Sequence, residues 1–121
     1  VMEGITYGLR DSFELVKAAT PVKRVLLVGG GAKNAAWRRM IAANVKASVS
    51  VPLVDEGGAY GAAMLAALGG GVSLDEVKGW IKIRETVEPD PAESAAYDRV
   101  YPQFRALYAD LKERFDATAG M

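Results

Sequence analysis

Apolar and polar residues alternate in patterns that divide the chain into expected helices and strands. From residue 2 to 18 apolar side chains recur every three or four positions, which predicts an amphipathic helix. A β-branched apolar run within residues 23–28 predicts a short strand buried on both faces of a parallel sheet. A helix over 35–46 and a second strand over 49–54 are expected next. Pro52 places that second strand near a sheet edge or a bulge.

The second half of the chain is predicted to be mainly helical. A helix from residue 58 or 59 to 68 is apolar on nearly all sides, so we expect it to be sandwiched between other elements. Ser73 begins a capping box and a short helix, whereas 81–91 lack a helical period and predict an extended segment or loop. A last helix spans about 92–116, bent but not ended by Pro102. Its aromatic stripe must pack on something: Tyr97, Tyr101, Phe104, Tyr108, Leu111 and Phe115.

This order of elements predicts an α/β fold with an incomplete parallel sheet flanked by helices. The chain has 121 residues, which suits one domain, but it yields only two clear strands and begins inside an expected helix. We therefore expect residues 1–121 to form a single partial domain whose remaining strands lie in another part of the protein. An uncovered sheet edge and apolar helix faces then predict self-association.

Composition removes several classes of function. Fifteen basic residues balance fifteen acidic ones, so we expect neither nucleic acid nor an anionic membrane as a partner. The absence of histidine and cysteine removes the commonest general base, the commonest metal ligand and all thiolate chemistry. No signal-peptide core or apolar run of membrane-spanning length is found, and a cytoplasmic location is expected.

The most informative segment is the corner where residues 25–28 run into Gly29-Gly30-Gly31 and a new helix begins after Asn34. Glycines without Cβ atoms let backbone amides approach a ligand, and a helix start favours phosphate. Asn34 is a suitable N-cap, and Arg38 and Arg39 are expected to face away from the buried side of that helix. The segment is a candidate nucleotide site, although a tight turn without a ligand is equally compatible with a glycine triplet.

Two common nucleotide motifs fit this corner only in part or not at all. The dinucleotide pattern G-x-G-x-x-G is met at Gly29 and Gly31 but broken at Asn34, and Asp55 stands where a ribose-binding carboxylate is expected. An NAD-binding domain therefore remains an alternative, as does a non-enzymatic interaction module whose corner is structural. A Walker loop is excluded, because Lys33 is not followed by serine or threonine.

Taken together, the ordered segments resemble one family. The set comprises G-G-G-A-K-N, a helix with Trp37, a strand with Val51-Pro52, the segment from Glu56 to Ala63 and a final aromatic helix. It resembles the C-terminal part of the FGGY carbohydrate kinases, most closely the xylulokinases among them. The resemblance covers almost the whole chain. It implies the C-terminal portion of an actin-like ATPase (ribonuclease H-like) domain, with ATP or ADP bound against it.

The resemblance also implies a division of labour. Gly30, Gly31 and Ala32 would line the adenosine and α-phosphate side through their backbone, and Asn34 would border the adenine pocket. The full enzyme would transfer the γ-phosphate of ATP to a pentulose such as D-xylulose. The catalytic carboxylate and the Mg²⁺ ligands come from N-terminal segments in that family, so we expect no catalytic residue here and no turnover by this chain alone.

Other candidate residues have simple structural explanations. Asp55 and Glu56 are in reach of a ribose, but acids in a polar loop are usually just solvated. Lys33 in a strand–helix loop is more often an exposed charge than a phosphate ligand. Trp37 and Trp80 are candidates for flanking a base, although the helical spacing of Trp37 favours a core position.

Overall fold

A computed structural model describes residues 1–54 and 57–120. Over these residues the elements follow in the order α1 (Met2–Ala19), β1 (Arg24–Leu26), a 3-10 turn (Gly30–Lys33), α2 (Ala35–Val45), β2 (Ser48–Pro52), α3 (Gly57–Gly69), α4 (Leu74–Gly79), β3 (Ile83–Val87) and α5 (Pro91–Ala119). The predicted helices are thus confirmed, with ends shifted by a few residues. None of the helices in this described part is long and apolar enough to cross a bilayer.

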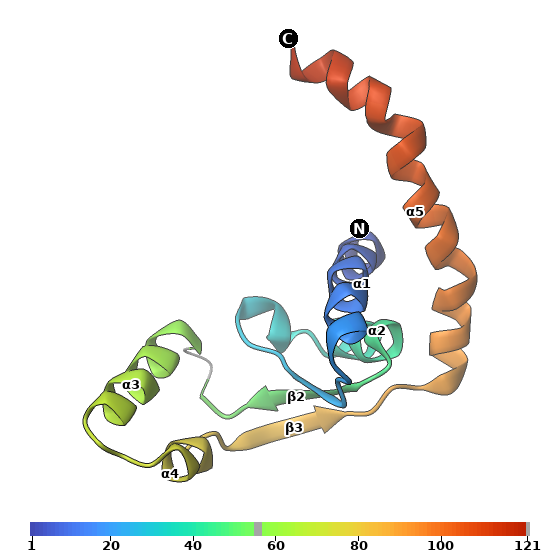
Figure 1. Cartoon of the computed structure of the whole chain (residues 1–121). Coiled ribbons are helices and arrows are strands. Elements are labelled where there is room, and N and C mark those ends of the chain that lie inside the picture. The colour runs from blue at the N-terminus through green and yellow to red at the C-terminus, as the bar shows by residue number, and fades with distance from the viewer. Residues whose placement is uncertain (55–56, 121) are drawn as a thin grey trace.

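The sheet has three strands in the order β1-β2-β3, of which β2 is central. β2 and β3 lie side by side in Figure 1. β1 runs parallel to β2, and β3 runs antiparallel to it. The expected α/β fold with an incomplete sheet flanked by helices is confirmed. To the two expected strands the structure adds β3, because part of the segment expected to be extended or loop pairs with β2. The register shifts between Val51 and Pro52, so the proline sits at a bulge, as its missing N–H requires.

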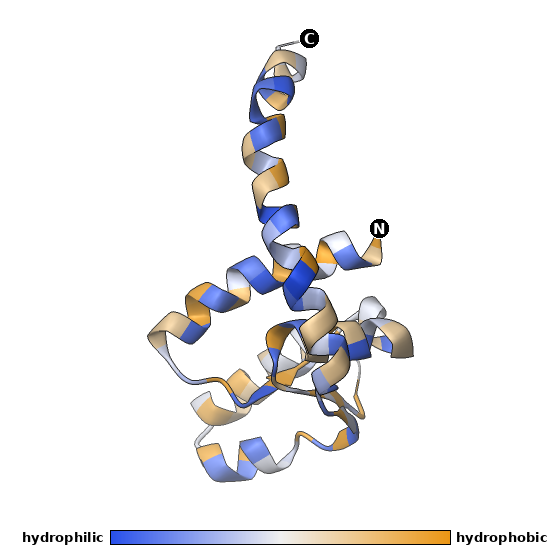
Figure 2. Ribbon diagram, turned by 90° about the vertical axis from the view of Figure 1, so that its right-hand side faces the viewer, coloured by the Kyte–Doolittle hydropathy of each residue, from blue (hydrophilic) through white to orange (hydrophobic). Residues whose placement is uncertain are grey.

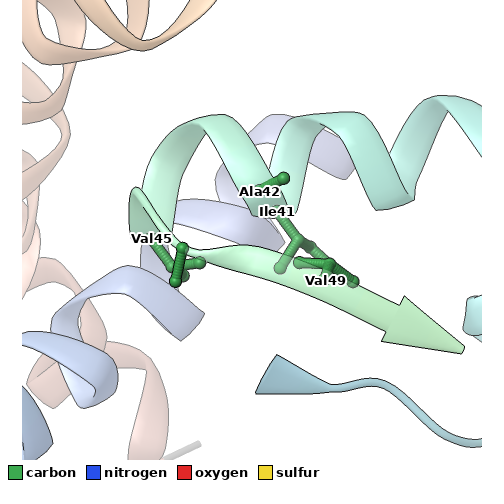
Figure 3. Close-up of a cluster of buried hydrophobic side chains, with 5 residues drawn as sticks. Ile41, Ala42, Val45 and Val49 are labelled. Atoms are coloured by element: carbon green, nitrogen blue, oxygen red, sulfur yellow. The ribbon is translucent and has the colours of Figure 1, made fainter. Parts of the chain in front are cut away.

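Burial is concentrated on the central strand and on the helix before it. Ile41 and Val45 of α2 lie on the side of the helix that faces β2, where Val49 is fully buried (Figure 3). Ala42 belongs to the same buried cluster. β1 does not have the two-sided burial that its sequence predicts. Leu26 is 41% exposed and Arg24 is exposed as well, so only Val25 between them is partly buried.

Helix α5 is long, curved and divided into two environments (Figure 1). It continues through Pro102, as predicted, and a proline inside a helix is an ordinary cause of curvature. Its N-terminal half packs on α1, where Tyr7 contacts the rings of Tyr97, Tyr101 and Phe104 at centroid distances of 6.0, 5.9 and 5.2 Å. Its C-terminal half stands clear of the other helices and carries alternating apolar and polar residues (Figure 2).

The expected burial of α3 is also wrong for this chain, since none of its residues is buried. Leu65 on this helix is 71% exposed. α3 lies at the end of the sheet that is away from α1, and it packs against α4 (Figure 1). Most of the rest of its surface is therefore open to solvent.

Candidate functional site

The glycine corner is a tight backbone turn between β1 and α2. Gly29 has φ 91° and ψ 177°, a conformation that favours glycine, and Gly30–Lys33 form one turn of 3-10 helix. The amide of Ala32 donates to the carbonyl of Gly29 at 3.0 Å, and that of Asn34 donates to Gly31 at 3.1 Å. The amides of the first residues of a helical turn have no carbonyl to reach within it. Gly30 and Gly31 therefore supply the N–H groups that this turn can direct at a ligand.

The two glycines of the turn have opposite surroundings. A Cβ built on Gly30 would meet nothing within 4 Å, so that face of the corner is open. A Cβ built on Gly31 would lie 1.9 Å from Cζ3 of Trp37, so the space beside Gly31 is already filled by the indole. The corner is thus open toward solvent at Gly30 and closed from inside at Gly31.

Two side chains of α1 reach the same corner. The indole Nε1 of Trp37 donates to Oγ1 of Thr6 at 2.9 Å, and Thr6 is fully buried. Asn34 caps α2 by accepting from the backbone N–H of Trp37 at 3.1 Å, as predicted, and its Nδ2 lies 3.7 Å from Sδ of Met2. Any contact of Asn34 with adenine would come from a side chain whose oxygen is engaged in capping.

Arg38 ties the corner to the sheet. It donates to the carbonyl of Ala32 at 2.7 Å and to Oε2 of Glu85 in β3 at 2.8 Å. The expectation that Arg38 faces away is wrong, because its side chain is only 12% exposed, whereas Arg39 is exposed as predicted. Sequence reasoning missed Glu85 altogether, since its role depends on the pairing of β3 with β2.

An apolar cleft of about 220 Å³ lies on the other side of β1, next to the start of α3. A Cβ on Gly57 would lie 3.1 Å from Cγ2 of Val28, so glycine at this position allows the start of α3 to lie close to the residues that precede the corner. Trp80 lines this cleft, whereas Trp37 packs against the core beneath Gly31, so the two tryptophans do not flank one space. Further side chains that line the cleft are Leu26, Pro52, Val54, Tyr60 and Met64.

The remaining polar candidates are not gathered at the corner. Lys33 is exposed at the end of the 3-10 turn, and Asp55 and Glu56 lie outside the described residues. Within 1–54 and 57–120, no three His, Cys, Asp or Glu side chains come together as a metal site would need.

The groups with shifted pKa values lie instead between α1 and α5. Hydrogen bonds from Lys46 and Arg10, each at 2.7 Å, lower the pKa of Asp98. Burial raises the pKa of Tyr7, Tyr97 and Tyr101. These groups join α5 to the helices beside it and are remote in sequence from the glycine corner.

Solved structures of two kinases have the same fold as this chain. The chain superposes with a TM-score of 0.78 on the crystal structure of xylulose kinase from Rhodospirillum rubrum, at 31% identity over 95% of this chain and 24% of that one. It superposes with a TM-score of 0.80 on gluconate kinase from Lactobacillus acidophilus, at 25% identity over 92% of this chain and 23% of that one. The fold is that of the actin-like ATPases.

The sequence comparisons then give the family. Residues 1–70 match the model of the C-terminal domain of the FGGY family of carbohydrate kinases. Xylulose kinase of Bacillus subtilis is 35% identical over 117 residues, covering 93% of this chain and 23% of that protein. The chain belongs to the FGGY family. It spans about a quarter of the length of the curated relatives that it matches.

Proposed function

We propose that this chain is the nucleotide-binding C-terminal segment of an ATP-dependent sugar kinase, a single partial domain over residues 1–121. Gly30 and Gly31 would hold ATP or ADP through their amides, with Ala32 and Asn34 shaping the same side. The observation that carries the proposal is the open face of Gly30 at the start of the 3-10 turn, whose first N–H groups are not used within the turn and favour phosphate. Such a kinase would use the ATP of the cytoplasm.

A pentulose such as D-xylulose is the proposed phosphoryl acceptor of the complete kinase. Several relatives carry the name xylulose kinase, which supports a five-carbon ketose. A structural neighbour called gluconate kinase shows that the same fold serves other acceptors, so the segments that contact the sugar decide between them.

Phosphoryl transfer also needs a carboxylate to accept the sugar hydroxyl proton and Mg²⁺ to neutralise the phosphates. We assign these groups to the part of the kinase that corresponds to the other three quarters of the relatives. When bound, the metal would supply charge neutralisation, and this chain would contribute orientation of the nucleotide. The chain alone should therefore give no D-xylulose phosphorylation with ATP and Mg²⁺, and turnover at an enzyme-like rate would overturn this assignment.

The test of nucleotide binding is calorimetric titration of the chain with ADP and, separately, with NADH. We expect ADP binding with a Kd on the order of a millimolar or tighter, since only part of the site is present. Gly30→Ala should weaken ADP binding, because its new methyl group occupies the open face. Gly8→Ala, at an exposed position of α1 with equal space, is the matched control and should bind as the parent does. Preference for NADH would favour the dinucleotide-binding alternative, and binding of neither would leave the corner a structural turn.

We further propose that the chain self-associates through its exposed apolar residues. The basis is the number of large apolar side chains on the surface, including Leu65 at 71% and Leu15 at 76% exposure. Sedimentation velocity should show an average mass that rises with concentration, and Leu65→Glu should reduce it. A single monomeric species at all concentrations would contradict this proposal.

A further inference from the structure

The glycine corner has an inner support that its sequence does not reveal. Trp37 lies one helical turn after the corner, and its six-membered ring fills the space where Gly31 would carry a side chain, 1.9 Å from the Cβ position. Real Cβ atoms do not approach other atoms so closely, so Gly31 and Trp37 are sterically linked. Gly30, one residue earlier, has no such neighbour.

The ring of Trp37 is held so that it cannot easily yield. Its Nε1 donates to Oγ1 of Thr6 at 2.9 Å, and that hydroxyl in turn donates to the carbonyl of Met2 at 2.8 Å. Thr6 has no exposed surface, so its hydroxyl cannot exchange these partners for water. A movement of the indole would break the hydrogen bond that it makes to the buried hydroxyl of Thr6, which costs stability.

We infer that Trp37 is a positioning residue for the nucleotide site, fixed by Thr6 and acting through Gly31. The indole holds the 3-10 turn from inside, so that the amides of Gly30 and Gly31 keep one orientation toward the open face. The two glycines then have different roles. At Gly31 the absence of a side chain leaves room for Trp37, and at Gly30 it leaves room for a phosphate-bearing ligand. This inference rests on the proposed nucleotide function.

The steric link is tested without any nucleotide, by urea unfolding of Gly31→Ala, Trp37→Leu and the double variant. Gly31→Ala should lower the unfolding midpoint strongly in the parent chain. In the Trp37→Leu background the same change should lower it far less, because the smaller side chain leaves room for the new methyl group. Equal losses in both backgrounds would overturn the inference, since Gly31 would then be needed for another reason.

The positioning role is tested by the Kd for ADP, measured where the chain is fully folded. Thr6→Val keeps the shape of the side chain but removes the acceptor for Nε1 of Trp37. It should raise the Kd for ADP about tenfold, which corresponds to the free energy of one hydrogen bond. Thr6→Ser retains the hydroxyl and should restore binding. Val45→Ala, a buried change at the far end of α2, serves as the control that lowers stability with an unchanged Kd.

The outcomes separate this inference from the proposed function. If ADP does not bind the parent chain while the Gly31–Trp37 coupling is found, the proposed function fails and Trp37 has a structural role only. If ADP binds the parent and Thr6→Val with equal Kd, the function stands and the positioning role is overturned.

Discussion

Helices α2 and α3 both begin after a strand and a glycine-containing segment, but α2 is buried and α3 is exposed. α2 follows β1 through Gly29-Gly30-Gly31, and α3 begins after β2 with Gly57-Gly58. Five residues of α2 are buried, whereas none of α3 is. Yet α3 carries no charged side chain, while α2 has two arginines.

The difference shows that an apolar composition does not by itself bury a helix. In α2 the apolar side chains Trp37, Ile41 and Val45 follow one another at intervals of four, and the stripe that they form matches the face of β2. α3 is apolar all round, so no single face of the sheet can cover it. Within this chain the patterned helix forms the core, and the uniformly apolar helix is left at the surface.

The largest expected effect compares one residue from each helix. Ile41→Ala in α2 should lower the free energy of unfolding by about 2–5 kcal/mol, because it leaves a cavity against Val49. Leu65→Ala in α3 should change it by less than about 0.5 kcal/mol, because the side chain is largely exposed. Urea unfolding at low protein concentration measures both. Equal losses would mean that α3 is covered in solution, and the comparison would fail.

The same contrast can be drawn within α5, where one aromatic stripe has two environments. Phe104→Ala should cost about 2–3 kcal/mol, because the ring packs against Tyr7. Phe115→Ala, at a 51% exposed position on the same stripe, should cost less than about 1 kcal/mol. Both changes gain the same helix propensity, so the difference reports packing alone. Thermal unfolding of the two variants provides the measurement, and a similar loss in both would contradict the division of α5.

Features that depend on one segment were predictable from the sequence, and features that depend on distant pairing were not. The cap at Asn34, the glycine turn and the periodic helices follow from local chemistry and were found. The strand β3 and the Arg38–Glu85 pair were not, because they depend on β2 bringing residues 38 and 85 together. The aromatic stripe of α5 has one period throughout, so nothing in it distinguishes the half that meets Tyr7 from the half that does not.

Two lysine–aspartate ion pairs of α5 compare its two halves again, with smaller expected losses of stability. Asp98 and Asp116 each accept from a lysine at 2.7 Å, but Asp98 also binds Arg10, whose side chain is 9% exposed. Asp98→Ala should cost about 1–2 kcal/mol, since Arg10 loses its one hydrogen-bonded partner among the described side chains. Asp116→Ala should cost no more than about 0.5 kcal/mol, as exposed pairs one helical turn apart do.

The acid dependence of Asp98 gives a second readout of the same pair. Its pKa lies below the ordinary value of 3.8 because Lys46 and Arg10 donate to it in the fold. The stability that it contributes is therefore complete above the ordinary pKa and is lost as the pH falls through the folded value. The difference in unfolding free energy between the parent and Asp98→Ala should shrink below about pH 4. A difference that stays constant down to acid pH would show that packing, and not charge, is responsible.

The smallest expected effect lies at alkaline pH, on the packed half of α5. Burial, and the hydrogen bond that its hydroxyl donates to Asp11, raise the pKa of Tyr101 to about 12. Because the folded pKa exceeds the ordinary value of about 10, the protonated phenol stabilises the fold fully below pH 10. That contribution is lost as the pH rises from about 10 to about 12. The stability difference between the parent and Tyr101→Phe should therefore disappear across this window in urea titrations. A stability difference that stays constant across this window would contradict the prediction.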